Sequence, residues 1–491
     1  MNPLTNSLMV RAADAPVIKP AVELGTPLLL TIAAIGVAVL LVMIIRFKIQ
    51  AFVALLTVSI LVAVASTIPL QDIFTVVSSG VGGTMGKVAI LIALGAVLGR
   101  MIEVSGGVQS LADHFTRKLG ARRVAVALTA VGFLVAIPVF FEVGIIVLVP
   151  IVYAFAKIAK VHPVKFGLPM AGIMLSIHVA VPPHPGIVAG AGVLGADIGL
   201  IALISLVICI PLGFLSYWVA SIMNRKDYEL LPAVKAQVDE FGSDSLVRVG
   251  HEGPGAAAAA VIAPPRPGLI IFLIAAPIVQ ILLGTVGTLI IPKDNSWYGL
   301  ASFIGNPFFA LLVAVALSFF LLAVRRNWSL KETGEIFEGA LPPIASILMV
   351  VAAGGVFGNV LQVSGIGTAL SKTLDTLGVP LLLLGFIISL ALRAAQGSAT
   401  VAIVTTTGLL SAAVSSGGYS PAQIAVIVIA IGFGALGLSH VTDAGFWVVV
   451  RYYGLTVSDG LKTWTVLTTI LGLAGFALTF VAWIVVGGLG A

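Results

Sequence analysis

The sequence contains few charged residues. Asp, Glu, Lys and Arg make up 9% of its 491 residues, whereas an average soluble domain has about 25%. Hydrophobic residues make up 59%, and the mean hydropathy is +1.17. A water-soluble fold cannot cover that much apolar surface with polar side chains. We therefore expect the lipid bilayer to surround most of the chain, and the formal charge of +6 to reflect membrane topology rather than a nucleic-acid partner.

Cysteine and the usual catalytic motifs are also scarce. Cys209 is the only cysteine, which excludes an intrachain disulfide and a metal site built from cysteines. The sequence has no phosphate-binding loop, dinucleotide fingerprint or metalloprotease motif. We therefore expect no enzymatic activity, cofactor or metal, and we expect any transport to be driven by a gradient or a partner.

Long apolar runs predict membrane-spanning helices. Lipid cannot satisfy backbone polar groups, so a span must be a helix or part of a closed barrel. Runs of about 20 residues fit helices, whereas a barrel would show alternating segments of about ten residues. The sequence thus predicts an all-α polytopic membrane protein. The expected segments are 26–46, 51–68, 86–104, 122–137, 141–156, 166–195, 198–220, 268–291, 300–323, 341–363, 379–393, 398–414, 421–453 and 462–488.

Polar segments divide the chain into four parts. Residues 1–25 are polar and lack the apolar core of a cleavable signal. A first transmembrane repeat is expected at 26–220 and a second at 268–491. Between them, residues 221–267 mix charges, alanines and prolines, which predicts a flexible cytoplasmic loop.

The two halves resemble each other in sequence. Residues 97–106 align with 356–365 at an offset of 259, and Gly186 and Gly445 share that offset. Internal repeats are common in secondary transporters. Chance similarity of glycine-rich apolar sequence is the alternative.

Basic residues predict that the repeats are inverted. Lys and Arg mark cytoplasmic loops, and they gather after the first span, at 105–123, at 157–165 and at 325–331. These loops make 122–156 and 379–414 hairpins that enter and leave the membrane on one side. Two full spans in each place would put basic clusters outside. Residues 105–118 are expected to be a solvated loop without a site.

The first half offers three candidate residues. Glu142 lies at the first hairpin tip among apolar residues, where a carboxyl suits proton carriage or substrate coupling. The alternative is a structural carboxyl that accepts hydrogen bonds from free amides at a helix start. His178 and His184 flank prolines that must break the 166–195 helix. Each histidine is expected to bind hydroxyls or relay protons, or else to be a packing residue.

The second half offers a site for a carboxylate. Arg393 lies at the second hairpin tip, just before a helix start whose free N–H groups favour anions. The alternative is an arginine that neutralises Glu142 or Asp443. Asp443, in a second helix break, falls opposite His184 at the repeat offset and is expected to cap a helix, bind hydroxyls or hold a cation. The other candidates for substrate binding are Gln396, Gly397, Ser398, Thr400, Ser439 and Thr442.

Several motifs stand out, at 99–107, 137–144, 165–172, 182–186, 393–402, 438–440 and 445–447. Together they resemble the gluconate permease (gluconate:H⁺ symporter) family, over about residues 46–473. The resemblance implies uptake of gluconate or a related sugar acid with protons across a bacterial inner membrane. It also implies membership of the ion-transporter superfamily and elevator-type movement. A homo-oligomer is expected by analogy only.

One departure from the family leaves the substrate open. The family often reads His-Val-Asn-Asp-Ser-Gly where residues 440–445 read His-Val-Thr-Asp-Ala-Gly. A carrier for D-serine, a fructuronate-like acid or another hydroxy acid is therefore an alternative. Coupling to sodium, with Asp443 as a ligand, is a second alternative, and a channel without coupling is a third.

Overall fold

The computed structural model describes residues 18–119, 123–226, 228–232, 234–235, 238, 264–377 and 380–489, and these contain helices, turns and loops but no strand. This confirms the all-α prediction. Ten of the helices or helix pairs are long and apolar enough to cross a membrane. The first half contains α2 (Thr26–Ile45), α3 (Ala51–Ala65), α4 (Leu70–Val104), α5 (Gly107–Leu119), α6 (Val124–Val135), α7 (Phe141–Ala159), α8 (Val164–Ala180), α9 (Pro185–Leu194) and α10 (Ile198–Met223). The second half contains α12 (Pro267–Ile290), α13 (Ser296–Ile304), α14 (Pro307–Ser318), α15 (Leu330–Gly339), α16 (Pro342–Val363), α17 (Ile366–Leu377), α18 (Leu381–Gln396), α19 (Ala399–Ser416), α20 (Pro421–Leu436), α21 (Ala444–Tyr452), α22 (Val457–Gly460) and α23 (Val466–Leu489).

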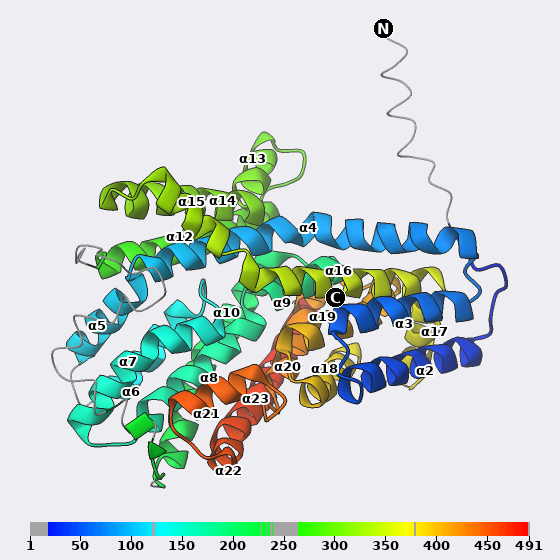
Figure 1. Cartoon of the computed structure of the whole chain (residues 1–491). Coiled ribbons are helices and arrows are strands. Elements are labelled where there is room, and N and C mark those ends of the chain that lie inside the picture. Colours follow the sequence, from blue (N-terminus) through cyan, green and yellow to red (C-terminus); the bar gives the residue numbers. More distant parts are fainter. Residues whose placement is uncertain are drawn as a thin grey trace.

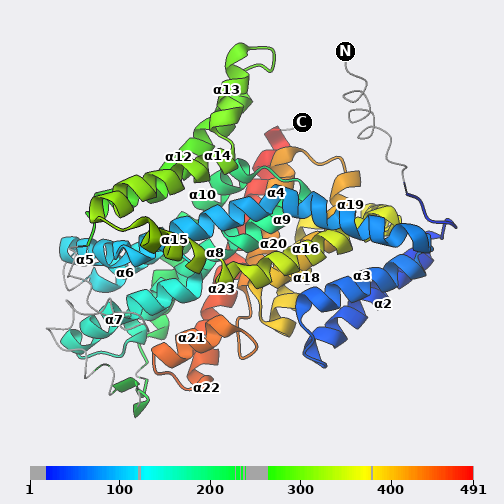
Figure 2. The same ribbon diagram turned by 45° about the horizontal axis from the view of Figure 1, so that its top comes forward.

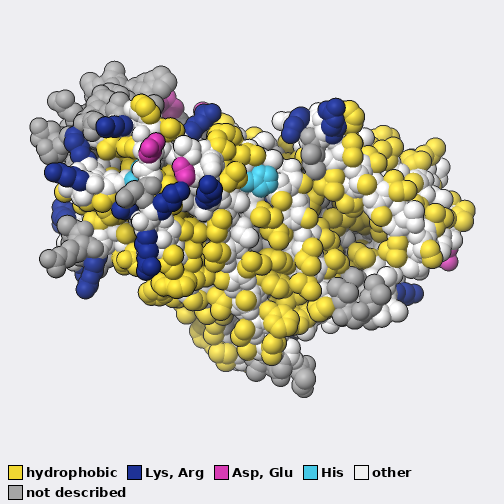
Figure 3. Space-filling model, turned by 90° about the horizontal axis from the view of Figure 1, so that it is seen from below, with side chains coloured by type: hydrophobic (Ala, Val, Ile, Leu, Met, Phe, Trp, Pro, Cys, Tyr) yellow, Lys and Arg dark blue, Asp and Glu magenta, His cyan; other side chains and the backbone are white. Residues whose placement is uncertain are grey.

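The helices form two groups. One contains α2, α3, α4 and α16, which lie alongside one another (Figure 1). The other contains α8, α10, α20 and α23, which pack together through the middle of the molecule (Figures 1 and 2). Hydrophobic side chains cover much of the face seen in Figure 3, and Lys and Arg gather toward the end that holds α5 to α7. A membrane protein with charged ends and an apolar belt has this distribution.

Helix α4 is longer than the predicted span 86–104, because it begins at Leu70 and has 35 residues. Its first half contains glycines and hydroxyl residues that do not stand out as an apolar run. Gly80 contacts the backbone of α16, where an added Cβ would lie 2.7 Å from the Cα of Val356. Small residues allow such close packing of membrane helices, so tertiary contact extends the helix where hydropathy is weak.

Two other predictions were wrong in detail. The expected span 300–323 is interrupted, since α13 ends at Ile304 and α14 begins at Pro307 after Asn306, whose side chain accepts a hydrogen bond from Phe308 N at 2.9 Å. Residues 105–118 are not a solvated loop but mostly form α5. Its Val108 and Leu111 are fully buried, as expected when apolar residues recur every three to four positions on one helix face.

The repeat is visible in the positions of the helices. At an offset of 259, α5 corresponds to α17, α9 to α21, and α4 to α15 plus α16. The equivalent helices α4 and α16 run antiparallel, because Asn359 of α16 donates to Val76 O of α4 at 2.8 Å, while Gly355, earlier in α16, lies against Thr84, later in α4.

A pair of reciprocal contacts shows the symmetry between the halves. A Cβ at Gly186 would lie 3.2 Å from Thr400 Cα, and a Cβ at its equivalent Gly445 would lie 3.1 Å from Phe141. Phe141 and Thr400 are themselves equivalent at the offset of 259. A two-fold axis between the halves produces such exchanged contacts. The chain therefore contains two inverted-topology repeats.

The predicted division into four parts falls partly outside the described residues. Residues 1–17 and most of 221–267 are not among them. The described part of the N-terminal segment, residues 18–25, is hydrogen-bonded to the loop between α3 and α4, where Ala21 N donates to Thr67 O at 2.8 Å. The boundaries at 26, 220 and 268 fall within a few residues of the ends of α2, α10 and α12.

Candidate functional site

Two helical hairpins carry the candidate residues at their tips. Helices α6 and α7 are joined by residues 136–140, and α18 and α19 by Gly397 and Ser398. Both turns lie where the sequence predicts them. Each hairpin faces a broken helix, since α8 ends at Ala180 before α9, and α20 ends at Leu436 before α21. The tips and the breaks together build the site.

Gly397 joins the second tip to the second break. Its φ of +85° is in the left-handed region, which glycine adopts without strain. A Cβ here would lie 2.0 Å from the carbonyl oxygen of Thr442. Ser398 then begins α19, and its hydroxyl accepts a hydrogen bond from Val401 N at 3.4 Å. The tip can approach the break closely only because this position has no side chain.

The first break meets the first tip in the same way. Nε2 of His184 is hydrogen-bonded to the carbonyl oxygen of Ala136, the first residue after α6. His184 is 3% exposed. Its ring lies 4.4 Å from the ring of His178 and 6.2 Å from that of Phe140, measured between centroids. The two histidines predicted from the sequence are therefore adjacent at the tip.

Arg393 and Asp443 form a buried ion pair between the second tip and the second break. The guanidinium is 2% exposed and also donates through Nη1 to the Gly397 carbonyl oxygen. Its Nε is buried and has no hydrogen-bond partner among the described residues. Arg393 thus neutralises Asp443, which was the alternative drawn from the sequence, and its Nε–H is left without an acceptor among the described residues.

Asp443 has a second, structural role. Its Oδ1 accepts a hydrogen bond from Gly445 N at 3.0 Å and so caps α21. Its Oδ2 accepts from Ser439 Oγ as well as from Arg393. Capping and ion pairing are therefore compatible in one carboxylate, and these bonds hold it in place before any ligand arrives.

Glu142 and His178 complete the cluster from the first half. Glu142 is partly exposed in the first turn of α7 and lies within electrostatic range of Asp443 and Arg393. His178 interacts electrostatically with His184 and Arg393, and its Nδ1 is buried without a partner among the described residues. The site thus combines a guanidinium, two carboxyls and two imidazoles from both repeats.

The remaining predicted residues lie at the rim of the second tip. Gln396 Nε2 donates to Ser398 O at 3.4 Å, and Thr442 Oγ1 donates to Ala394 O at 3.4 Å. Thr400 lies against Gly186 of α9. Gln396, Thr400 and Thr442 are at least partly exposed.

The sequence analysis missed Trp464. This side chain is fully buried, donates from Nε1 to Ser439 Oγ at 2.7 Å and stacks on Phe141 at 5.6 Å. It therefore links the second break to the first hairpin. It lies in a π-helical turn, Leu461–Thr465, that precedes α23. A tryptophan in an apolar run gives no signal of such a turn, although π-turns are often found at functional sites.

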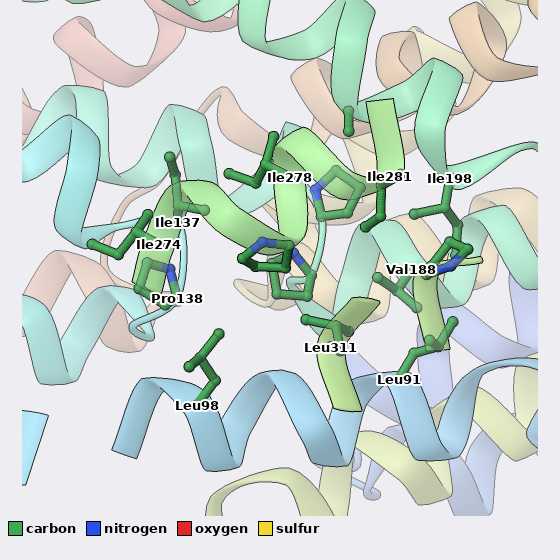
Figure 4. Close-up of a pocket in the computed structure, with 15 residues that line it drawn as sticks. Leu91, Leu98, Ile137, Pro138, Val188, Ile198, Ile274, Ile278, Ile281 and Leu311 are labelled. Carbon is green, nitrogen blue, oxygen red and sulfur yellow. The ribbon is translucent and has the colours of Figure 1, made fainter. Parts of the chain in front are cut away.

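An apolar cavity lies beside the first tip (Figure 4). Ile137 and Pro138 of the tip line it together with Leu98 of α4, Ile278 of α12 and Leu311 of α14. Its lining residues are all leucine, isoleucine, valine, alanine or proline. It cannot hydrogen-bond a polyhydroxylated anion, so we do not place the substrate there. Nor do three His, Cys, Asp or Glu side chains come together as a metal site in the part of the chain that the structure describes.

Comparison with known proteins now defines the family. The family described as GntP family permease matches residues 28–485. The chain belongs to the GntP permease family. It is 51% identical over 463 residues to the inner membrane permease YgbN of Escherichia coli K12, covering 94% of this chain and 100% of that protein. It is 31% identical over 446 residues to the high-affinity gluconate transporter of E. coli K12 (91% and 97% covered), and 32% identical over 457 residues to the gluconate permease of Bacillus subtilis 168 (93% and 100% covered).

Two solved structures share the fold of this GntP permease. Neisseria gonorrhoeae MtrF, described among a class of antimetabolite efflux pumps, matches with a TM-score of 0.63 and 13% identity, over 84% of each chain. The YdaH transporter of Alcanivorax borkumensis matches with a TM-score of 0.51 and 16% identity, over 85% of this chain and 89% of that one. The spans and the permease relatives make the protein a multi-pass transporter of the inner membrane.

Proposed function

We propose that this GntP permease takes up gluconate or a related sugar acid together with protons. The observation that carries the proposal is the cluster at the two tips, where Arg393 and Asp443 form a buried ion pair, Glu142 lies within electrostatic range of both, and His178 and His184 are adjacent. A guanidinium suits a carboxylate, and ionisable groups inside a membrane protein mark substrate and proton pathways. The relatives named gluconate permease or gluconate transporter point to the substrate class.

Each part of the site has a proposed role. The substrate carboxylate binds at Arg393 and at the free N–H groups where α19 begins, at Gly397, Ser398 and Thr400. Gln396 is proposed to contact the same carboxylate end of the substrate. Substrate hydroxyls bind to His184 and to the second break, at Ser439, Thr442 and Asp443. Glu142 is the proposed protonation site, and His178 is its partner in proton transfer.

The alternatives concern substrate and coupling ion. YgbN, the relative at 51% identity, carries no substrate in its name, and residues 440–445 depart from the family pattern. D-Serine, a fructuronate-like acid or another hydroxy acid is therefore the second candidate substrate. Sodium held by Asp443 is the second candidate for coupling. A non-coupled channel is disfavoured, because a pair of broken helices in two inverted repeats is typical of carriers.

The hairpins are proposed to be re-entrant and to slide along the helices that face them. In the first repeat, Gly99 of α4 meets the hairpin tip, since its added Cβ would lie 2.1 Å from Pro138 O. Its equivalent in the second repeat, Gly358 of α16, meets the arm of the hairpin instead, 2.9 Å from Ser411 Oγ and 3.3 Å from Gly408 O. Perfect two-fold symmetry would bring Gly358 to Gly397.

This asymmetry supports an elevator movement. Gly397 and Gly408 are eleven residues apart, about 16 Å at 1.5 Å per helical residue. We propose a second state in which the two repeats exchange these contacts. In that state the tip of the second hairpin contacts α16, and the arm of the first hairpin contacts α4. The movement between these states carries the site across the membrane.

Uptake into proteoliposomes tests the function. Labelled gluconate should accumulate above the outside concentration under an inward proton gradient, and a protonophore should collapse the accumulation. Accumulation driven by a sodium gradient instead would show that sodium, not the proton, is the coupling ion. Equilibration without accumulation would indicate a channel. If folded protein takes up no gluconate, gluconate is excluded as the substrate, and the other hydroxy acids and D-serine are tested next.

A further inference from the structure

A polar cavity lies apart from the hairpin tips, between α4, α9, α16 and α19. Its volume is about 140 Å³, roughly ten times the 10–15 Å³ that one water molecule requires. Polar side chains and glycines supply most of its walls, so it is wide enough and polar enough to hold water. The lining residues are Ser79, Gly80, Gly83, Thr84, Lys87, Gly192, Val193, Gly355, Gly358, Asn359, Gln362 and Ser411.

Lys87 gives this cavity its charge. It stands at the middle of α4, seventeen residues from each end, which is about 25 Å of helix on either side. The Lys87 side chain is exposed, and the hydrocarbon core of a membrane is about 30 Å thick, so a helix that crosses the membrane about its midpoint places this lysine within it. No acidic side chain lines the cavity, and the ion pairs formed among the described residues do not include Lys87. A cation at this depth requires water or an anion nearby.

The other polar groups suit the hydroxyls of a small acid. Asn359 Nδ2 donates to Val76 O at 2.8 Å and to Ser79 Oγ at 3.0 Å, which fixes the orientation of its amide. Gln362 and Ser411 add an amide and a hydroxyl on the α16 and α19 sides. Asn359 Oδ1 and Ser411 Oγ, which donates to Gly408 O at 2.9 Å, can accept hydrogen bonds from ligand hydroxyls, and the Gln362 amide can both donate and accept.

We propose that this cavity is a second binding site for the transported anion, with Lys87 receiving its carboxylate and Asn359, Gln362 and Ser411 its hydroxyls. This inference rests on the proposed function and extends it. Gly358, which the second hairpin tip would reach in the other elevator state, also lines the cavity. The cavity is therefore a waiting site, from which the anion passes to Arg393 when the tip arrives, or into which it is released.

Equilibrium binding of labelled gluconate to the purified full-length chain tests the number of sites. The wild type should bind two anions per chain, Lys87→Gln one, and Lys87→Arg two. In proteoliposomes, Lys87→Gln should raise KM about tenfold, as expected for the loss of one charge-assisted contact. Vmax should stay within about twofold of wild type, because the Arg393 site is intact.

Two glycines of α4 provide a matched pair of variants. An added Cβ at Gly82 or Gly83 meets no atom within 4 Å, but only Gly83 lines the cavity. Gly83→Leu should fill the cavity and reproduce the effect of Lys87→Gln, whereas Gly82→Leu should bind two anions. The two variants carry the same change in helix propensity, so a difference in anion binding between them is due to filling of the cavity.

Three outcomes would overturn the proposal. One is a single bound anion per wild-type chain. Another is an unchanged KM in Lys87→Gln. The third is loss of all binding in a Lys87→Gln chain with the wild-type melting temperature, because the two sites would then not be separate. Wild-type protein that takes up no gluconate would instead refute the proposed substrate. The same variants would then be compared with the acid that it does carry, and one bound anion would again exclude the second site.

Discussion

Arg393 and Asp443 lie 50 residues apart in the chain, yet form an ion pair in which both side chains are less than a tenth exposed. The pair joins the tip of one hairpin to the break of another helix. Two buried charges are stable together only while both are present, because removal of one leaves the other desolvated and unpaired. The pair therefore stabilises the contact between the hairpin tip and the helix break, and it is also part of the proposed anion site.

Removal of Arg393 should destabilise the protein more than neutralisation of both partners. Breaking a buried pair costs about 3–5 kcal/mol, so Arg393→Met should lower the melting temperature in detergent by several degrees. The double variant Arg393→Met/Asp443→Asn should recover most of that loss, since Asn can still accept hydrogen bonds. Neither variant should take up gluconate. Full uptake by the double variant would remove both residues from the substrate site.

Substitution of Gly397 should strongly reduce uptake, because a side chain there prevents the close contact between the hairpin tip and the helix break. In Gly397→Ala the new Cβ would lie 2.0 Å from Thr442 O, and a positive φ costs a non-glycine residue about 1–2 kcal/mol. Gly418→Ala is the matched control, because Gly418 has a φ of +66° but open space around it. Initial uptake should fall more than tenfold in Gly397→Ala and stay near wild type in Gly418→Ala. Equal losses would show that strain, not the contact between tip and break, limits activity.

Neutralisation of Glu142 should separate proton coupling from substrate exchange. Glu142→Gln keeps the size of the side chain but removes the titrating group at the first tip. The variant should exchange labelled for unlabelled gluconate across the membrane at near wild-type rates. A proton gradient should no longer drive accumulation.

The control for this variant is Glu338→Gln, on the exposed surface of α15, which should behave as wild type in both assays. Undiminished proton-driven accumulation by Glu142→Gln would exclude Glu142 as the protonation site. It would leave the residue the structural role that the sequence analysis also allowed.

Sliding of the second hairpin should be trapped by cross-links to α16. In a Cys209→Ser background, Asn359→Cys should be linked to Ser411→Cys by a short bis-methanethiosulfonate reagent in the state described here. In the other state it should react with Ser398→Cys at the tip. Each cross-link should stop uptake, and reduction of the cleavable reagent should restore uptake to the level of the same cysteine variant before linking. Active protein that forms only the 359–411 cross-link would contradict the movement.

The sequence predicted much of this site, for identifiable reasons. Proline and glycine at 182–186 and at 397 mark helix breaks and turns, whatever the tertiary context. Intramembrane Glu142, Arg393 and Asp443 stand out because charges are rare in the chain. Helix ends and rare charges are local signals, which a single sequence carries.

The features that the sequence did not predict depend on packing between distant segments. The first half of α4 is a helix because Gly80 can lie against α16, and hydropathy does not record that contact. Trp464 belongs to the site because a π-turn brings its indole to Ser439. Lys87 was overlooked because its significance comes from a cavity shared by four helices.

The most direct test of the central claim measures protons and substrate together. Wild-type proteoliposomes loaded with a pH indicator, without any imposed ion gradient and with valinomycin and potassium to prevent charge build-up, are given gluconate from outside. The proposed mechanism predicts that the lumen acidifies as gluconate enters, and that Glu142→Gln shows no acidification. Gluconate entry through the wild type at an unchanged lumenal pH would contradict proton symport by this permease.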